Sequence, residues 1–312
     1  MKRREFLKKS VSIGAAIGGS AAGSIFTLGA PGTLFGAVGQ AENRPGLVGV
    51  MGGKPGPMFD KGINALGGIR KFVKPNQTVV VKPNIGWDKE PEEAANTNPD
   101  LIKQIVSQCL DAGAKKVYVF DHTADVWQKC YTHSGIKNAV KTAGGKMVPG
   151  NNERNYQRIK IPKGKSLTGA YAHELFLESD VFINVPILKN HIATKLTIGM
   201  KNLMGVVWDR GWWHSHNLHQ CVADFATFRI PDLTVVDAYR VLKKNGPMGV
   251  SVDDTLLMKA QIISTDPVAA DAAAAKMFGM NPADVPYIKM AHDMGVGTMD
   301  LTSIDIKRIR MK

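Results

Sequence analysis

The chain has 312 residues, of which 44% are hydrophobic and 21% are charged, and this balance excludes a disordered chain and a membrane protein of many spans. Lys and Arg outnumber Asp and Glu by 40 to 27, so the net charge of +13 favours anionic partners. Three cysteines are too few for a disulfide-rich scaffold or for an iron–sulfur cluster held by four cysteines. No helix-turn-helix or zinc-finger pattern is present, so nucleic acid is not an expected partner.

The first 41 residues are typical of an export signal. Residues 3–9 (RREFLKK) resemble a twin-arginine signal, a weakly apolar, glycine-rich stretch follows, and residues 39–41 offer small side chains for cleavage. We therefore predict a twin-arginine signal peptide over residues 1–41, a mature domain over 42–312 and a periplasmic location. After cleavage no stable membrane span is expected. An uncleaved N-terminal anchor is the alternative.

Beyond the signal, short β-branched or apolar runs alternate with stretches of helical periodicity. In chain order the predicted elements are strand 47–51, helix 58–72, strand 78–81, helix 99–112, strand 116–120, helix 134–143, strand 181–185, helix 217–228, strand 233–236, strand 256–263, helix 268–278, helix 284–294 and strand 303–309. Residues 146–172 are expected to form an irregular insertion and residues 205–216 a long loop. This order predicts an α/β fold: a mostly parallel sheet with helices on both faces, in a single large domain with insertions.

Polar side chains follow the ends of several predicted strands. They are Lys82 and Asn84, Asp121 and His122, Lys189 and His191, Asp237, and Asp266. In open parallel sheets ligands bind outside the carboxyl ends of the strands, so these residues are candidates for one shared site. The plainer alternative is that strand ends meet water and carry polar residues for that reason alone.

The lysines suit an anionic small molecule as the ligand. An ammonium group binds a carboxylate or phosphate as a point charge, and burial beside another lysine lowers the pKa of an amine into the range of a base or nucleophile. Lys201 and Asn202 join the candidates because Gly199 and Gly205 flank them and let the backbone approach a ligand. The predicted catalytic residues are Lys189, His191 and Lys201. The predicted ligand-binding residues are Lys82, Asn84, Asp121, Asn202, Asp237 and Asp266.

The segment around residues 205–216 is rich in tryptophan and histidine. His214, His216 and His219 form an H-x-H-x-x-H pattern, and neutral imidazoles suit divalent transition metals such as Zn, Ni, Cu or Fe. We therefore predict a metal site at these three histidines, with a divalent transition metal as the candidate cofactor. Alternatively, histidines beside tryptophans only pin a loop, and the Trp-rich loop 205–216 is a lid or a docking surface for a redox or maturation partner.

Several segments, in a consistent order over residues 47–310, resemble the domain-of-unknown-function family 362 (DUF362). They read VVVKPNIGW, DAGAKKVYVFD, FINVPILKNH, GMKNLMGV, DLTVVDA and STDPVAADAAAAKMFGM. The resemblance implies that the family's recurring polar positions fall on Lys82, Asn84, Asp121, Lys189, His191, Lys201, Asn202, Asp237 and Asp266. Many members carry a Cys-rich ferredoxin module that these residues do not contain, so electron transfer through iron–sulfur clusters is not implied. A remote likeness to nickel-dependent racemase folds is also noted.

Two functions are compatible with these patterns. The leading hypothesis is an exported enzyme, metal-dependent if the three histidines bind a metal, that acts on an anionic small molecule at the strand ends. In the alternative the chain is a non-catalytic protein that binds a cofactor or serves in maturation and docks its partner through the Trp-rich loop. The activity of the resembled family is undefined, so the resemblance does not choose between them.

Overall fold

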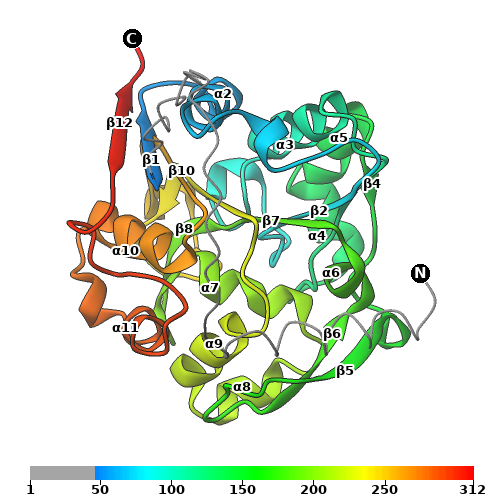
Figure 1. Ribbon diagram of the computed structural model, residues 1–312, viewed down its shortest axis with the longest axis vertical. Helices are drawn as coiled ribbons and strands as arrows, with labels where there is room; N and C mark the ends of the chain where they lie inside the picture. The colour runs from blue at the N-terminus through cyan, green and yellow to red at the C-terminus, as the bar shows by residue number, and fades with distance from the viewer. Residues whose placement is uncertain (1–45) are drawn as a thin grey trace, which may run out of the picture. The chain divides into compact units, whose positions relative to one another are not determined.

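A ten-stranded mixed sheet runs through the part of the chain that this computed structural model describes, residues 46–312 (Figure 1). Its strands are β1 (Leu47–Met51), β2 (Thr78–Pro83), β3 (Lys116–Val119), β4 (Lys146–Met147), β7 (Val181–Val185), β8 (Ile187–His191), β9 (Lys195–Thr197), β10 (Leu233–Leu242), β11 (Thr255–Ser264) and β12 (Ile306–Arg310). A separate hairpin pairs β5 (Tyr156–Lys160) with β6 (Gly169–His173). The predicted signal peptide lies outside the described residues.

Most neighbouring strands of the large sheet are parallel. The order is β12-β1-β11-β10-β7-β2-β3-β4, while β8 pairs with β10 and with β9. Parallel pairing joins β1 to β12, β10 to β7 and β8, and β2 to β7 and β3. In contrast, β11 is antiparallel to both of its neighbours, β1 and β10. The predicted α/β fold with a mostly parallel sheet is therefore confirmed, with β11 as an antiparallel strand inside it.

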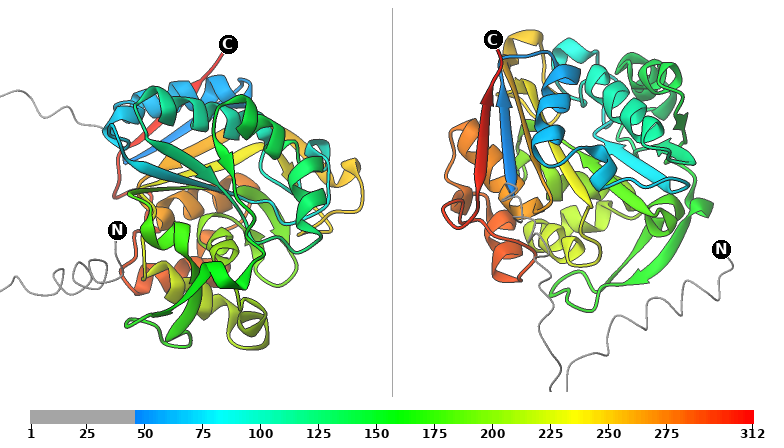
Figure 2. Two further views of the ribbon diagram at one scale, coloured as in Figure 1. Left: turned by 90° about the vertical axis from the view of Figure 1, so that its right-hand side faces the viewer. Right: turned by 45° about the horizontal axis from the view of Figure 1, so that its top comes forward.

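Helices cover both faces of this sheet. They are α2 (Pro55–Ala65), α3 (Pro99–Asp111), α4 (Trp127–His133), α5 (Ile136–Thr142), α6 (Glu174–Glu178), α7 (Gly199–Asn202), α8 (Gly211–Ser215), α9 (Leu218–Ala226), α10 (Pro267–Phe278) and α11 (Pro286–Asp293). Helices α2 and α3 pack on one face, and α7 and α10 pack on the other (Figure 2). In the described part of the chain, no helix combines the length and the apolar character needed to cross a bilayer.

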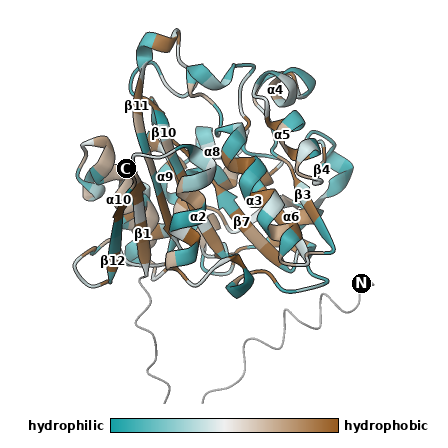
Figure 3. Cartoon of the chain, turned by 90° about the horizontal axis from the view of Figure 1, so that it is seen from above, coloured by the Kyte–Doolittle hydropathy of each residue, from teal (hydrophilic) through white to brown (hydrophobic). Residues whose placement is uncertain are grey.

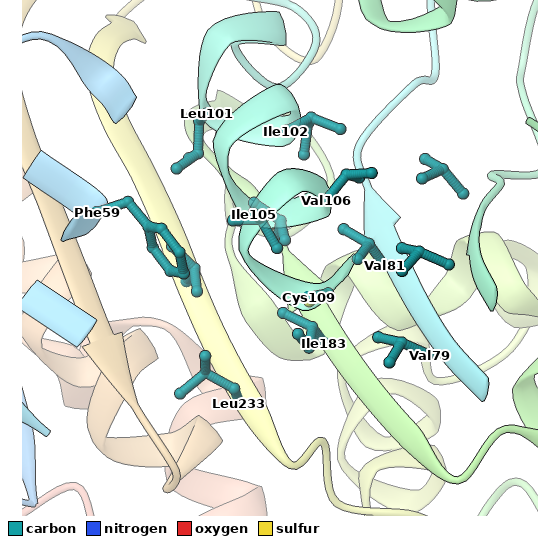
Figure 4. Close-up of a cluster of buried hydrophobic side chains, with 14 of the residues drawn as sticks. Phe59, Val79, Val81, Leu101, Ile102, Ile105, Val106, Cys109, Ile183 and Leu233 are labelled. Carbon is teal, nitrogen blue, oxygen red and sulfur yellow. The ribbon is translucent and has the colours of Figure 1, made fainter. Parts of the chain in front are cut away.

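The core lies between the parallel strands and the helices α2 and α3. Both helices carry hydrophobic and hydrophilic residues, as an element with one buried face must (Figure 3). Cys109 and Ile105 of α3 lie over Val81 and Ile183 of the strands, and all four side chains are fully buried (Figure 4). Burying an aliphatic side chain contributes about 1.5–3 kcal/mol, so this layer holds the helices firmly against the sheet.

Local signals explain where most helices begin and end. The side chain of Asn98 accepts a hydrogen bond from the backbone N–H of Asp100 at 2.9 Å and so caps α3. The predicted helix 58–72 is wrong at both ends, because α2 begins at Pro55 and stops before a glycine pair. Gly67 and Gly68 have φ angles of 102° and 82°, which other residues rarely adopt.

Two segments expected to be irregular contain regular structure. Residues 146–172 hold β4 and most of the β5–β6 hairpin, and residues 205–216 hold α8. Helix α4 and the antiparallel pair β8–β9 were not predicted. The pair was missed because the apolar alternation of residues 187–197 is short and begins directly after a proline. These additions matter because β8 and the segment before α8 both reach the cavity described below.

Candidate functional site

A cavity of about 330 Å³ lies at the carboxyl ends of β2 and β3 and beside β8. Its size falls at the lower end of the range for small-molecule sites, about 300–1,000 Å³. The predicted residues that line it are Asn84, Asp121, Lys189, His191, Lys201, Asn202 and His214. The structure therefore brings together residues that are up to 130 positions apart in the sequence. They come from the strand ends, from α7 and from the Trp-rich loop.

A buried ion pair forms the floor beneath this cavity. Lys82 Nζ lies 2.8 Å from Asp121 Oδ1, and the side chains of Lys82 and Asp121 are 0% and 3% exposed. The other carboxylate oxygen of Asp121 accepts the backbone N–H of Ile85 at 2.7 Å. Burial lowers the pKa of Lys82, whereas the adjacent carboxylate opposes that shift. Because each charge is matched by the other, this pair is held as a unit and not left as two isolated charges.

Gly205 makes room for the ion pair. A Cβ atom at this position would overlap the carboxylate of Asp121 and lie 2.7 Å from Lys82 Nζ. Only glycine therefore lets the backbone of this turn pass directly over the two charges. This is the close approach that the sequence predicts for Gly205, although its reason is the packing of an ion pair and no ligand is needed to explain it.

Side-chain amides connect the strand ends to α7. Asn84 Nδ2 donates to Asn202 Oδ1 at 2.9 Å, and Asn202 Nδ2 donates to Asn184 Oδ1 at 2.9 Å. Asn184 in turn donates to the carbonyl of Gly199 at 2.9 Å, which ties β7 to the start of α7. A satisfied network of this kind rigidifies its members. Asn84 and Asn202, both predicted to bind a ligand, thus also hold the frame of the site.

Two lysine amines at the cavity have lowered pKa values. Lys189 Nζ donates to Asn84 Oδ1 at 2.9 Å and to the carbonyl of Ala95 at 2.5 Å. Burial, aided by the charge of Lys201, lowers the pKa of Lys189 to about 7. Burial also lowers the pKa of Lys201 to about 7, aided by Arg210 and Lys82. Near neutral pH each amine therefore exists partly as the free base.

Two histidines that line the cavity are held in opposite tautomers. His191 Nδ1 accepts the backbone N–H groups of Ala193 at 3.1 Å and Thr194 at 3.3 Å, so in the neutral ring the proton lies on Nε2. His122 Nδ1 lies 3.0 Å from the carbonyl of Val207, to which it donates, so its Nε2 carries a lone pair. Burial lowers the pKa of both rings, that of His191 to about 2. One ring is a hydrogen-bond donor and the other a base.

Arg210 is the residue of the site that the sequence did not reveal. Its guanidinium donates to the carbonyl of His122 and, at 2.5 Å, to the carbonyl of Thr123. It lines the cavity, and burial lowers its pKa. The residue lies in a loop, where no strand end or helical spacing marks it, and its neighbours in the sequence give no sign of its contacts. The only sign of a role in the sequence was that a basic residue stands within the Trp-rich loop.

Asp237 and Asp266 do not line the cavity, and both of their carboxylates are bound to backbone N–H groups. Asp237 lies within β10, which continues through a register shift, and accepts from the N–H groups of Asn98 at 2.7 Å and Tyr239 at 2.9 Å. Burial raises the pKa of Asp237 to about 6.

Asp266 follows β11, which runs antiparallel to β10. The carboxyl end of β11 therefore lies beside the amino end of β10, away from the strand ends that form the cavity. There it caps α10 through the N–H groups of Val268 at 2.8 Å and Ala269 at 2.9 Å. Both aspartates therefore stabilise turns and helix ends, which corrects the expectation that they join the other strand-end residues.

The three histidines proposed as metal ligands point to different neighbours. His214 lines the cavity, His216 stacks on Trp212 with ring centres 3.7 Å apart, and His219 lies beside Tyr287 with ring centres 6.2 Å apart. Among residues 46–312 no three His, Cys, Asp or Glu side chains are grouped as a metal site requires. The three histidines are therefore not gathered into one centre.

The tryptophans of the Trp-rich loop are mostly packed inward. Trp213 is 1% exposed and lies against Phe225, and Trp208 stacks on His122 with ring centres 4.9 Å apart. Trp212 is the more exposed one, at 36%. The loop thus forms a wall of the cavity and supports the ring of His122. Its use as a docking surface for a partner stays a prediction.

Comparisons with known proteins place this chain among relatives of undefined activity. Residues 79–276 match the family model described as "Domain of unknown function (DUF362)". The chain is 26% identical over 253 residues to the thylakoid-associated protein sll1697 of Synechocystis sp., a match that covers 75% of this chain and 73% of that protein.

The fold is similar to that of the lactate racemase apoprotein from Thermoanaerobacterium thermosaccharolyticum, with a TM-score of 0.50 and 11% sequence identity. That match covers 75% of this chain and 57% of the racemase chain. A protein from Thermotoga maritima is similar at a TM-score of 0.45 and 12% identity, over 73% of this chain and 60% of that one. This chain thus spans less than two thirds of either solved structure, and the likeness is one of fold alone.

Proposed function

The chain belongs to the DUF362 family, and we propose that this member is an enzyme that binds a small anionic molecule and transfers a proton to or from it. One observation carries the proposal. Lys189, Lys201 and Arg210 line the cavity, and among the described lining residues Asp121 is the one carboxylate. Because Asp121 already pairs with the buried Lys82, no carboxylate among the described lining residues is left to neutralise the other cations. A carboxylate or phosphate is the ligand that such a surplus attracts.

The two histidines and the lysine amines supply the groups for proton transfer. His122 Nε2 presents a lone pair, and the His191 Nε2–H donates to an oxygen of the ligand without carrying a charge. Lys189 and Lys201, with pKa values of about 7, take up or release protons near neutral pH. A base and an acid whose pKa values lie near the working pH are the most effective pair for this kind of catalysis.

Binding of simple anions tests the first half of the proposal. Oxalate and inorganic phosphate are titrated by calorimetry into the wild-type protein and into the Lys201→Ala and Lys103→Ala variants. Lys103 is an exposed lysine of α3 outside the cavity lining, and serves as the matched control. We expect Lys201→Ala to weaken binding by about tenfold or more, since a hydrogen bond to a charged group contributes about 1.5–3 kcal/mol and about 1.4 kcal/mol is tenfold in affinity. Lys103→Ala should leave binding unchanged. Failure of the wild type to bind either anion contradicts the proposal.

Proton transfer is tested without knowledge of the natural substrate. Small 2-hydroxy and 2-oxo acids are incubated with the protein in D₂O, and exchange of the hydrogen next to the carboxylate or carbonyl is followed by NMR. His122→Ala should abolish exchange of any acid that the wild type turns over, because the lone pair at Nε2 is lost. Binding of oxalate with no exchange of any acid leaves an anion-binding protein and removes the enzymatic part. Elemental analysis of the same preparation tests the predicted transition metal separately.

The location of the protein is proposed from the sequence alone. Residues 1–41 support export by the twin-arginine route to the periplasm. Replacing Arg3 and Arg4 together by lysine should retain the protein in the cytoplasm, as measured by fractionation. Export that is unchanged in this variant would remove the twin-arginine assignment.

A further inference from the structure

Three lysine amines lie at or beneath the cavity, and one of them has no partner. Lys82 Nζ pairs with Asp121 and donates to the carbonyl of Pro83 at 2.6 Å. Lys189 Nζ donates to Asn84 and to a backbone carbonyl. For Lys201 Nζ the described residues provide no hydrogen-bond acceptor and no ion-pair partner, although the residue is only 9% exposed. Lys201 lines the cavity and its amine is not one of the fully buried unpaired atoms, so Nζ is accessible from the cavity and free to contact a ligand.

The backbone that carries Lys201 is fixed from both sides. Upstream, the carboxylate of Asp271 accepts the N–H groups of Gly199 at 2.7 Å and Met200 at 3.0 Å. Downstream, Asn202 belongs to the amide network of the strand ends. A Cβ atom on Gly199 would lie 2.7 Å from an Asp271 oxygen, so the contact requires glycine. The Lys201 side chain therefore starts from an anchored position and ends free in the cavity.

Most of the groups that act on this amine favour its neutral form. The charged and titratable groups that line the cavity with it or act on its charge are Lys82, Asp121, His122, Lys189, His191, Arg210, His214 and His219. Burial is the main cause that lowers the pKa of Lys201, Arg210 and Lys82 add to it, and Asp121 opposes it. A neutral amine has a lone pair and is a nucleophile toward carbonyl carbon.

Building on the proposed function, we propose that Lys201 Nζ forms an imine with the carbonyl carbon of a small 2-oxo acid bound in the cavity. The lone pair of Nζ forms the N–C bond while the π electrons of the C=O bond move to oxygen. The two protons of the amine then leave with that oxygen as water, and the C=N bond remains. The step needs no oxidant, reductant or further reactant. His122 Nε2 is the base that carries protons from nitrogen to oxygen.

The cavity has a group for each end of such a ligand. Arg210 uses two of its N–H groups on backbone carbonyls, and a guanidinium has five, so donors remain for the carboxylate. The His191 Nε2–H is available to the carbonyl oxygen, because Nδ1 is occupied by backbone N–H groups. The carboxylate is what the surplus positive charge attracts, and the adjacent carbonyl is what the free amine attacks.

Reductive trapping tests the imine directly. The full-length protein is incubated with pyruvate or glyoxylate at neutral pH, sodium borohydride is added, and the adduct is located by peptide mass spectrometry. We expect saturable labelling at Lys201, with a mass gain equal to that of the acid less one oxygen atom. Lys201→Arg keeps a cation but cannot form the imine, so it should lose the label and still bind oxalate. Exposed Lys103 is the internal control for random labelling.

The outcomes separate this inference from the proposed function. Saturable label on Lys201 that oxalate suppresses supports both. Oxalate binding with no adduct, or with label on Lys189 in place of Lys201, overturns the imine and leaves the anion-binding enzyme standing. Equal labelling of Lys103 and Lys201 shows non-specific chemistry and also overturns it. If neither oxalate nor an oxo acid binds, both ideas fail together.

Discussion

Lys82 in β2 and Asp121, which follows the adjacent parallel strand β3, meet as a buried ion pair, with 2.8 Å between Nζ and Oδ1. Asp121→Asn should destabilise the fold by about 3–5 kcal/mol, because it leaves the Lys82 charge buried and unmatched. Unfolding in urea measures this loss. Asp111→Asn, an exposed position on α3, is the matched control and should change the free energy of unfolding by no more than about 0.5 kcal/mol.

The same pair can be tested by removing both charges. The double variant Lys82→Met with Asp121→Asn should recover part of the stability that Asp121→Asn loses, because no isolated charge then remains in the interior. A double variant that is no more stable than Asp121→Asn alone would show that the lost interaction is the contact of Asp121 with the Ile85 N–H and not its charge.

Two glycines of the same segment should respond differently to alanine. A Cβ at Gly205 collides with the Lys82–Asp121 pair, whereas nothing lies within 4 Å of a Cβ built on Gly211. Gly205→Ala is therefore expected to lower the melting temperature strongly, by an amount equivalent to about 1–3 kcal/mol or more. Gly211→Ala should be close to neutral. Similar behaviour of the two variants in a thermal melt would mean that the turn over the ion pair yields without cost.

Anion affinity should depend on pH through the two amines of lowered pKa. Lys189 and Lys201 have pKa values of about 7, so both are charged below that pH and lose their protons above it. Oxalate affinity should fall by up to about tenfold for each pH unit above 7 for each lysine that must be protonated. Calorimetry between pH 6 and 9 measures the slope. Lys201→Arg should make the slope shallower, and an unchanged slope would assign the titration elsewhere.

Asp266 is expected to matter for stability and not for binding. Its carboxylate caps α10 and also accepts the N–H of Thr298 at 2.8 Å. Asp266→Ala should therefore cost about 1–2 kcal/mol in the free energy of unfolding, while Asp266→Asn keeps the cap and costs less. Oxalate affinity should stay the same in both variants. Weaker binding in either one would return Asp266 to the site.

The sequence predicted the parts of the site that depend on parallel strands. Asp121 lies where it does because a strand that begins in the core must end near its parallel neighbours. Lys189 and His191 also reach the cavity, but they lie within β8, a strand that the sequence did not predict. Asp266 was misplaced because periodicity identifies β11 as a strand without giving its direction. Asp237 was misplaced because β10 continues past it through a register shift, which depends on pairing with β11.

Arg210 and the tautomers of the histidines depend on contacts between distant segments. Arg210 is held by carbonyls of residues 122 and 123, which are nearly ninety positions away in the chain. His122 presents a lone pair at Nε2 because its proton stays on Nδ1, which donates to the carbonyl of Val207. No local pattern encodes such contacts, since they arise when the Trp-rich loop folds back over the strand ends.

Because β11 runs antiparallel to its neighbours, the part of the chain that follows it should tolerate different substitutions from the part that lines the cavity. All residues that line the cavity come from positions 84–214, apart from Pro247. The segment from β11 to β12 contributes two strands of the sheet, α10 and its caps, and it contacts the site indirectly, for example through the hydrogen bonds of Asp271 to α7. Substitutions in that C-terminal part should thus change the stability of the protein, and with it the lifetime in the cell, before they change ligand binding or activity.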